Sequence, residues 1–348
     1  MKREVRPSAT TSEYNSSLLC ARGLWTALSV VLLVTLLTAC KKKETPAEGA
    51  PGPEATASTP APRDVTIPKP GPVLPAQVAL KIGLASGLRD PRGVGVDGSG
   101  NVYVVDTGNN RVVKFDPSGK ELLTFGKKGS DPGQFVQPWV LAISQGNVLV
   151  LDSDTTWIQV FSPAGKLLAR LGGPDLAFYH PSGLAMALDG TALVVDTGGN
   201  RIVPIKPDGN PLPPLTSAGK EKYSQPTDIC SDARGGLHVY QTAAARTPSL
   251  FYHLTPTGEL SSKWIAPNAL STRDTPRAAM AGDGRLYVTD PQSQQVRVYD
   301  ADGRAYHLLL VEGPDAMPFR GLTGIAVDAQ GNVYVVDGGA NVVYRLKV

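Results

Sequence analysis

The four histidines are the first candidates for metal binding in this sequence, because neutral imidazole is a common ligand of zinc. His180, His238, His253 and His307 fall at different places in the pattern of short apolar runs that fills the chain. We therefore expect them at different distances from the centre of the molecule, where they do not converge on one ion. The sequence predicts no metal site and no cofactor.

An acidic or amide residue recurs at the end of a Val- or Tyr-rich run, six residues after a glycine. Carboxylates are ligands of hard cations such as calcium, which is one interpretation of the series. A short acceptor followed by Gly and Asn also binds the backbone of its own loop and ends a strand, and we favour this structural role. The series consists of Asp106, Asp152, Asp196, Gln241, Asp290 and Asp337.

Three cysteines give no disulfide framework. Cys20 and Cys40 lie near the N-terminus, and Cys230 takes a place in the repeating pattern that elsewhere is mostly Gly or Ala. We expect Cys230 to be a small buried hydrophobe and not a reactive thiol. No Ser/His/Asp set and no paired carboxylates stand apart from the pattern, so we assign no catalytic residue.

Arginines and aromatics occupy positions where small polar residues suffice in other copies of the pattern. The position after a recurring proline is Arg92, Trp139 or Arg277 in three copies and Ser or Thr in the others. Such side chains are enriched in binding hot spots, although the tryptophans alternatively only pack between repeats. The predicted ligand-binding residues are Arg92, Trp139, Trp157, Tyr179, His180, Arg277 and Arg320.

These candidates belong to a repeat about 45 residues long, the length of a four-stranded propeller blade. The apolar runs are short, rich in Val, Ile, Leu and Tyr, and bounded by Gly, Asn, Asp or Pro, which predicts strands and not helices. The best copy spans residues 91–119. One turn of each unit is marked by Gly100, Gly146, Gly190, Gly235, Gly284 and Gly331, and a second by Gly119, Gly165, Gly209, Gly258 and Gly303.

The last copy ends after its third strand, which would leave a bare strand edge. Val78, Leu80, Ile82 and Leu84 share one face at strand period, and we expect this segment to supply the missing strand. The sequence thus predicts an all-β fold, a six-bladed β-propeller of four-stranded blades closed by an N-terminal strand. In such a ring the candidate residues surround the axial mouth.

The repeat resembles the NHL repeat across residues 78–348. Residues 104–112 (VVDTGNNRV) resemble its central signature, and residues 125–135 resemble its connection between blades. Three copies place Trp157, Gln295 and Val342 where the signature has Arg. We expect the signature arginines Arg111, Arg201 and Arg246 to lie across a neighbouring blade. The Gly-His and Trp-Asp dipeptides of WD repeats are absent at the repeat period.

Residues 1–39 have a basic start and a short apolar stretch, which indicates a signal peptide. The tetrapeptide Leu37-Thr38-Ala39-Cys40 resembles a bacterial lipobox, which implies lipidation of Cys40; a plain single-pass anchor is the alternative. Residues 40–77 are rich in Pro, Ala, Glu and Thr, and we expect a disordered tether. Lys41 and not Asp follows the cysteine, so the resemblance to enteric lipoproteins implies sorting to the outer membrane, and the expected location is its periplasmic face or the cell surface.

Residues 78–348 carry equal numbers of basic and acidic side chains, which disfavours nucleic acid as a partner. We expect a lipid-anchored scaffold of the cell envelope that binds a protein, peptide or glycan at the axial mouth; the oligomeric state is not readable. Peptide-amidating lyases resemble NHL propellers, and gluconolactonases and streptogramin lyases are propeller enzymes. A metal-dependent lyase or lactonase at the same mouth is therefore the alternative, and a structural spacer is the third.

Overall fold

The computed structural model describes residues 65–243, 248–268, 274–313 and 319–348. The predicted signal peptide, Cys40 and most of the tether lie outside these residues, as does Arg246. Within them the helical segments are two single turns, η1 (Thr107–Asn109) and η2 (Pro174–Leu176), and the rest of the regular structure is strand. No helix in the described ranges is long and apolar enough to cross a membrane.

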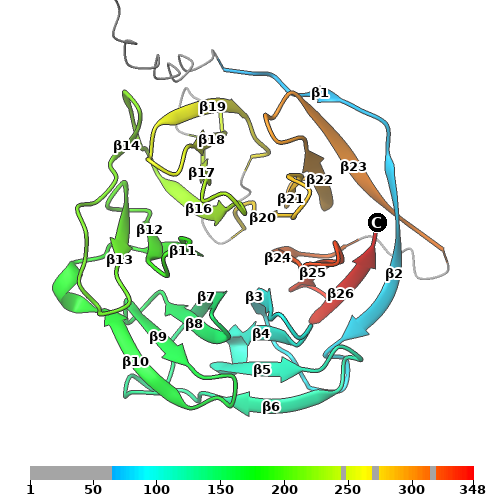
Figure 1. The fold of residues 1–348 in the computed structure, drawn as a ribbon. Helices are drawn as coiled ribbons and strands as arrows, with labels where there is room; N and C mark the ends of the chain where they lie inside the picture. The colour runs from blue at the N-terminus through cyan, green and yellow to red at the C-terminus, as the bar shows by residue number, and fades with distance from the viewer. Residues whose placement is uncertain (1–64, 244–247, 269–273, 314–318) are drawn as a thin grey trace, which may run out of the picture. The chain divides into compact units, whose positions relative to one another are not determined.

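Four sheets correspond to the first four repeats, and we number them one to four (Figure 1). Sheet one contains β3 (Pro91–Val96), β4 (Val102–Asp106), β5 (Arg111–Phe115) and β6 (Glu121–Phe125). Sheet two contains β7 (Pro138–Ser144), β8 (Asn147–Asp152), β9 (Trp157–Phe161) and β10 (Leu167–Gly172). Sheet four contains β16 (Pro226–Ser231), β17 (Leu237–Gln241), β18 (Leu250–Leu254) and β19 (Leu260–Ile265). Each pairs its strands antiparallel in chain order, as the repeat predicts.

Sheet three departs from the predicted four strands. It contains only β11 (Pro181–Met186), β12 (Ala192–Asp196) and β13 (Arg201–Ile205). The segment that should form its outer strand carries Pro211, Pro213 and Pro214, which have no N–H group to donate to a ladder. It makes isolated bridges to β13 instead, and a small hairpin of β14 (Ser217–Ala218) and β15 (Glu221–Lys222) follows.

The fifth and sixth repeats share one nine-stranded sheet, here called the joined sheet. The fifth repeat supplies β20 (Ala278–Met280), β21 (Leu286–Asp290), β22 (Gln295–Tyr299) and β23 (Ala305–Glu312). The sixth supplies β24 (Leu322–Val327), β25 (Val333–Asp337) and β26 (Val342–Lys347). The strand β2 (Leu74–Ile82) lies between β23 and β26, and the short β1 (Lys69–Pro70) pairs with β23.

The pairing of β2 with the last strand is the one expected from the sequence. It runs antiparallel to β26, from Gln77 opposite Lys347 to Ile82 opposite Val343, with a bulge near Ala79. Its first residues also run parallel to β23, which the sequence did not predict. Leu84 lies beyond the end of β2 and is 69% exposed, so its expected place on one strand face with Val78, Leu80 and Ile82 is wrong.

The expected tether is shorter at its C-terminal end than the sequence suggested. The backbone of Thr66 exchanges hydrogen bonds with Lys263 and Ile265 of sheet four, and β1 and the start of β2 precede Val78. The prediction that disorder extends to residue 77 is therefore wrong for residues 65–77. Unpaired strand edges on β19 and β23 offer these residues backbone partners in spite of their polar composition.

The core lies between neighbouring sheets. The second strand of a repeat is buried on both faces; in β4, for example, every residue from Val102 to Asp106 is buried. Runs such as Val-Tyr-Val-Val therefore do not alternate with polar residues, because each face packs against another sheet. The first strands lie innermost and contact one another in the order β3, β7, β11, β16, β20 and β24, and β24 also contacts β3 (Figure 1).

Candidate functional site

A cavity of about 290 Å³ lies among the innermost strands, and we call it the axial cavity. It is lined by residues of β3, β7, β11, β16, β20 and β24. Part of the lining is apolar, as at Leu141, Leu184 and Ile229. Three other lining residues are charged: Arg92, Asp228 and Arg277. Three of the seven predicted binding residues line this cavity: Arg92, Trp139 and Arg277.

Arg92 and Trp139 form one wall element of the axial cavity. The guanidinium carbon of Arg92 lies 4.3 Å from the centre of the Trp139 ring, within the range of a cation–π contact. Asp90 holds the same guanidinium at 3.1 Å. The sequence predicted these residues at an exposed mouth, with packing between repeats as the alternative for the tryptophan; in the structure Arg92 is 8% and Trp139 is 6% exposed.

Arg277 ties three innermost strands together. Its Nη1 donates to the carbonyl oxygen of Ser182 at 2.9 Å and lies 3.1 Å from Oδ1 of Asp228. Burial raises the pKa of the Asp228 carboxyl, and the charge of Arg277 opposes that shift. Oδ2 of Asp228 also accepts the backbone N–H of Ala278 at 2.8 Å. The two side chains therefore link β20 to β11 and β16 at the cavity wall.

The backbone of the innermost strands approaches closely at a glycine two residues after the start of a first strand, as at Gly324 of β24. A Cβ on Gly324 would collide with the carbonyl oxygen of Arg92 in the next sheet. A hydroxyl reinforces the same junction, because Thr323 donates to the carbonyl oxygen of Pro91 at 2.7 Å. Glycine at this position thus lets the first strands line a narrow cavity.

The other four predicted residues do not line the axial cavity. Trp157 begins β9, and the guanidinium of Arg170 lies over its ring at 4.2 Å. Tyr179 is 63% exposed, and its ring lies 4.6 Å from that of His180. Arg320 precedes β24, and its backbone N–H donates to Asp337. The structure thus brings three of the seven together at the cavity wall, and the place of the other four at the mouth stays a prediction.

The repeated acceptors have the structural role that we favoured, with an addition. Asp152 and Asp290 accept backbone N–H groups of their own loops, as predicted. Most of the series also accepts an N–H from the chain that leads into the same repeat; Asp106, for example, accepts from Arg89 at 2.7 Å. Each such side chain therefore holds the backbone just before the innermost strand of its repeat.

Two of the signature arginines, Arg111 and Arg201, bind within their own repeat, so their expected place across a neighbouring blade is wrong; Arg246 lies outside the described residues. Nε of Arg111 lies 2.7 Å from Oδ2 of Asp106, and Arg201 holds Asp196 at the same distance. In the fifth repeat, Arg297 takes this role two residues later than the signature position and contacts Asp290. The five-residue spacing brings both side chains to the same end of paired strands.

Cys230 lies on β16 and is partly buried at the wall of the axial cavity. Burial raises the pKa of its thiol well above the ordinary value, and the charges of Asp228 and Asp232 act in the same direction. Because its pKa is raised, the thiol stays protonated at neutral pH. The thiolate, which is the nucleophilic form, is therefore not present in appreciable amount. This agrees with the small hydrophobe expected from the sequence.

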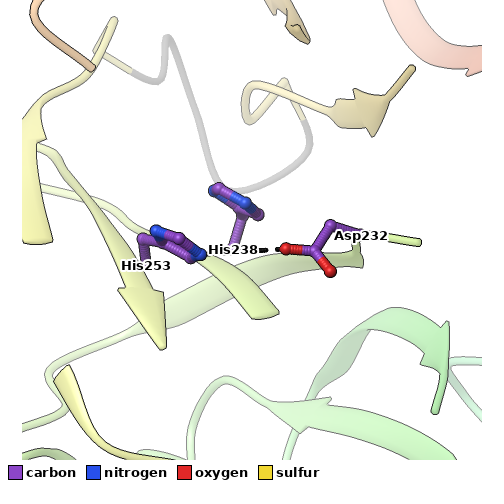
Figure 2. A group of neighbouring side chains, drawn as sticks. All are labelled: Asp232, His238 and His253. Carbon is purple, nitrogen blue, oxygen red and sulfur yellow. Dashed lines mark ion pairs between the residues drawn. The ribbon is translucent and has the colours of Figure 1, made fainter. Parts of the chain in front are cut away.

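Two histidines that were expected to lie apart are neighbours. His238 of β17 and His253 of β18 are opposite each other in the ladder, and their rings stack at 4.4 Å with an interplanar angle of 6° (Figure 2). Oδ2 of Asp232 lies 3.8 Å from Nε2 of His253. The prediction failed because it compared positions along the repeat and overlooked that adjacent strands place cross-strand pairs side by side.

Comparison with known proteins supports the fold and the repeat. Residues 88–115 match the NHL repeat family. None of the curated proteins matches the sequence.

Among solved structures, a streptogramin B lyase has a TM-score of 0.55 and 16% identity over 77% of this chain and 96% of its own. A Bacteroides thetaiotaomicron protein of unknown function has a TM-score of 0.59 and 15% identity over 78% and 73%. An auxiliary nutrient binding protein from Bacteroides ovatus has a TM-score of 0.52 and 16% identity over 75% and 69%. At such identities the likeness shows the fold alone.

Proposed function

From the NHL repeat and the propeller-like arrangement of the sheets, we infer a six-bladed β-propeller, closed by β2, that binds a ligand at the mouth of its axial cavity. The observation that carries this proposal is the wall element of Arg92 and Trp139. An arginine stacked on a tryptophan, both nine-tenths buried beside a cavity, is the kind of group that dominates binding energies.

The charges at the cavity favour a neutral or weakly charged ligand. Arg92 is held by Asp90, and Arg277 is held by Asp228, so each cation already has an anion within 3.1 Å. A cavity of about 290 Å³ is at the small end of ligand pockets and holds one side chain or one sugar ring. We propose a protein, peptide or glycan that inserts one such group from the mouth.

The proposal places this scaffold in the cell envelope. A signal peptide over residues 1–39, a lipid on Cys40 and a tether that now ends near residue 64 would hold the propeller at the periplasmic face of the outer membrane or at the cell surface. The motif Leu37-Thr38-Ala39-Cys40 supports this part of the proposal. Labelled fatty acid that is incorporated by the natural chain and not by Cys40→Ser would test it.

The alternative is a metal-dependent lyase or lactonase at the same mouth, and the similarity to a streptogramin B lyase fold keeps it in consideration. Asp228 is the one acid among the described residues that line the axial cavity, and no histidine lines it there. Because Asp228 is already bound to Arg277, a cation would have to displace a buried guanidinium. This makes binding the better-supported function.

The test uses the full chain as bait in a detergent extract of the envelope, with Trp139→Ala as the variant and Leu122→Ala as the matched control. Leu122 is on the outer strand β6 and is 51% exposed. We expect the captured partner to bind Trp139→Ala roughly tenfold more weakly or worse, the loss typical of a hot-spot residue. Circular dichroism establishes that each variant is folded. Unchanged affinity in folded Trp139→Ala and Arg92→Ala would contradict the proposal.

A further inference from the structure

The side chains of Asp232, His238 and His253 gather on sheet four, away from the axial cavity. One potential ligand atom from each lies within 4.8 Å of the other two (Figure 2). His238 is 2% exposed, and its Nδ1 has no hydrogen-bond partner. A buried polar atom without a partner is unfavourable unless something binds it.

The same positions of two other repeats contain a closed hydrogen-bond network instead. In sheet one, Oδ2 of Asp97 accepts from the side chains of Asn101 and Tyr103, at 2.9 and 3.3 Å. Lys114 is the residue opposite Tyr103 in the ladder. The sixth repeat has the equivalent set Asp328, Asn332, Tyr334 and Arg345.

Sheet four keeps the acid of this network and replaces every other member. Gly236 takes the place of the Asn, His238 that of the Tyr, and His253 that of the cation. The turn itself is unchanged, because Oδ1 of Asp232 accepts the backbone N–H of Gly236 at 2.8 Å, as Oδ1 of Asp97 accepts that of Asn101. The replacements therefore change the chemistry of the cluster and not its backbone.

Gly236 lets the acid and one imidazole lie close against the backbone. A Cβ at this position would collide with Oδ2 of Asp232 and would lie 3.1 Å from Nε2 of His253. Any other residue here would therefore force the Asp232 carboxylate to move.

We propose that Asp232, His238 and His253 form a binding site for a divalent transition metal, with zinc as the preferred ion. Two imidazoles and one carboxylate are a common ligand set for zinc, and a water molecule would complete the tetrahedron. The lone pair of each ring nitrogen lies in the ring plane, so the stacked rings must rotate apart to bind one ion. Because His253 is partly exposed, its ring is able to rotate.

The test is a titration of the full chain, freed of metal with a chelator and carrying no histidine tag, with ZnCl₂ in an isothermal titration calorimeter. We expect one equivalent to bind with micromolar affinity or better and to raise the melting temperature. CoCl₂ should give the visible absorption of a tetrahedral ion without the near-ultraviolet band of a thiolate ligand. Such a band would place the ion on a cysteine and overturn the proposal.

Variants separate this site from other sources of binding. His253→Gln and Asp232→Asn should each lower the affinity at least tenfold; the latter keeps an acceptor for the turn. The triple variant Gly236→Asn, His238→Tyr, His253→Lys copies sheet one and should abolish binding in a folded protein. His307→Gln is the matched control and should bind as the natural chain does. Absence of a stoichiometric ion, or an unchanged affinity in His253→Gln, would overturn the proposal.

Discussion

Sheets one and four are built on the same repeat but differ in how their polar side chains are bonded. In sheet one, Asp106 is fully buried and bonded to Asn109 and Arg111, and Asp97 is bonded to Asn101 and Tyr103. Sheet four has the neutral Gln241 in place of the first acid, and two imidazoles join the second acid in place of the amide and the phenol.

The difference separates what the fold needs from what it tolerates. An acceptor at the end of the second strand is needed in both sheets, since Gln241 accepts the backbone N–H of Ser224 as Asp106 accepts that of Arg89. A closed hydrogen-bond network at the turn between the first and second strands is not needed, since sheet four forms the same turn at Asp232 without it. Sheet four lacks the hydrogen-bond network that sheet one and the sixth repeat form at this turn. A departure of this kind from the other repeats is where a separate function is expected.

The largest effect should come from removing the acceptors themselves. Asp106→Ala removes a fully buried carboxylate that accepts from the Arg89 amide, from Asn109 and from Nε of Arg111, and we expect a loss of about 3–5 kcal/mol in the free energy of unfolding. Gln241→Ala removes a neutral acceptor and should cost about 1–3 kcal/mol. Urea unfolding measures both, and equal losses would contradict the view that sheet four is less dependent on this position.

An intermediate effect on the free energy of unfolding should appear when the pH of the metal-free protein is lowered. The pKa of His238 falls from 6.5 to about 3 on folding, so the unfolded chain binds more protons between these values. Stability is therefore complete above about pH 6.5 and decreases as the pH falls, by up to about 1.4 kcal/mol per pH unit for this group. Urea midpoints from pH 7.5 to 4.5 in a chelating buffer measure the slope.

The control for this slope is the triple variant that copies sheet one, which should lose most of it. In sheet one, burial acts to raise the pKa of Asp97, but hydrogen bonds from Asn101 and Ser99 outweigh it and the pKa is lowered. The stability that Asp97 contributes is thus present above its ordinary pKa of 3.8 and lost only below it. A slope at pH 5–6 that survives in the triple variant would assign it to other groups.

The smallest effect should follow from opening the network of sheet one. Tyr103→Phe removes the hydroxyl that donates to Asp97 at 3.3 Å while Asn101 still donates, and we expect a loss of about 0.5–1.5 kcal/mol. Tyr334→Phe in the sixth repeat should behave alike, because Tyr334 donates to Asp328 at 3.0 Å. A loss above about 3 kcal/mol in either variant would mean that the network is essential to the turn.

Much of the fold follows from short-range chemistry, and the sequence therefore predicted it. The turn glycines Gly100, Gly146 and Gly331 all have φ between 78° and 80°, a backbone conformation that marks a strand reversal in any repeat. The missing strand was found because β26 needs a partner and residues 78–82 alternate suitably. The outer strand of sheet three was predicted wrongly. The length of the repeat is unchanged there, although prolines have replaced residues whose backbone N–H groups would donate to the ladder.

The site was harder to predict, because it depends on depth and on cross-strand register. Arg92, Trp139 and Arg277 share one repeat position, so the pattern brought them together correctly. Trp157 and Tyr179 were chosen by proximity in the sequence, which does not distinguish the cavity wall from the rim. His238 and His253 are fifteen positions apart, and only the ladder of β17 and β18 makes them neighbours.

The ladder between β2 and β26 also governs when the molecule is able to fold during synthesis. Residues 74–82 leave the ribosome among the first of the described chain, whereas their antiparallel partners, residues 342–347, are made last. The nascent chain must therefore keep an apolar strand unpaired until residues 342–347 have been made, which exposes it to aggregation or to holding by a chaperone. A ribosome stalled before Val342 should carry a chain whose residues 74–82 remain open to protease.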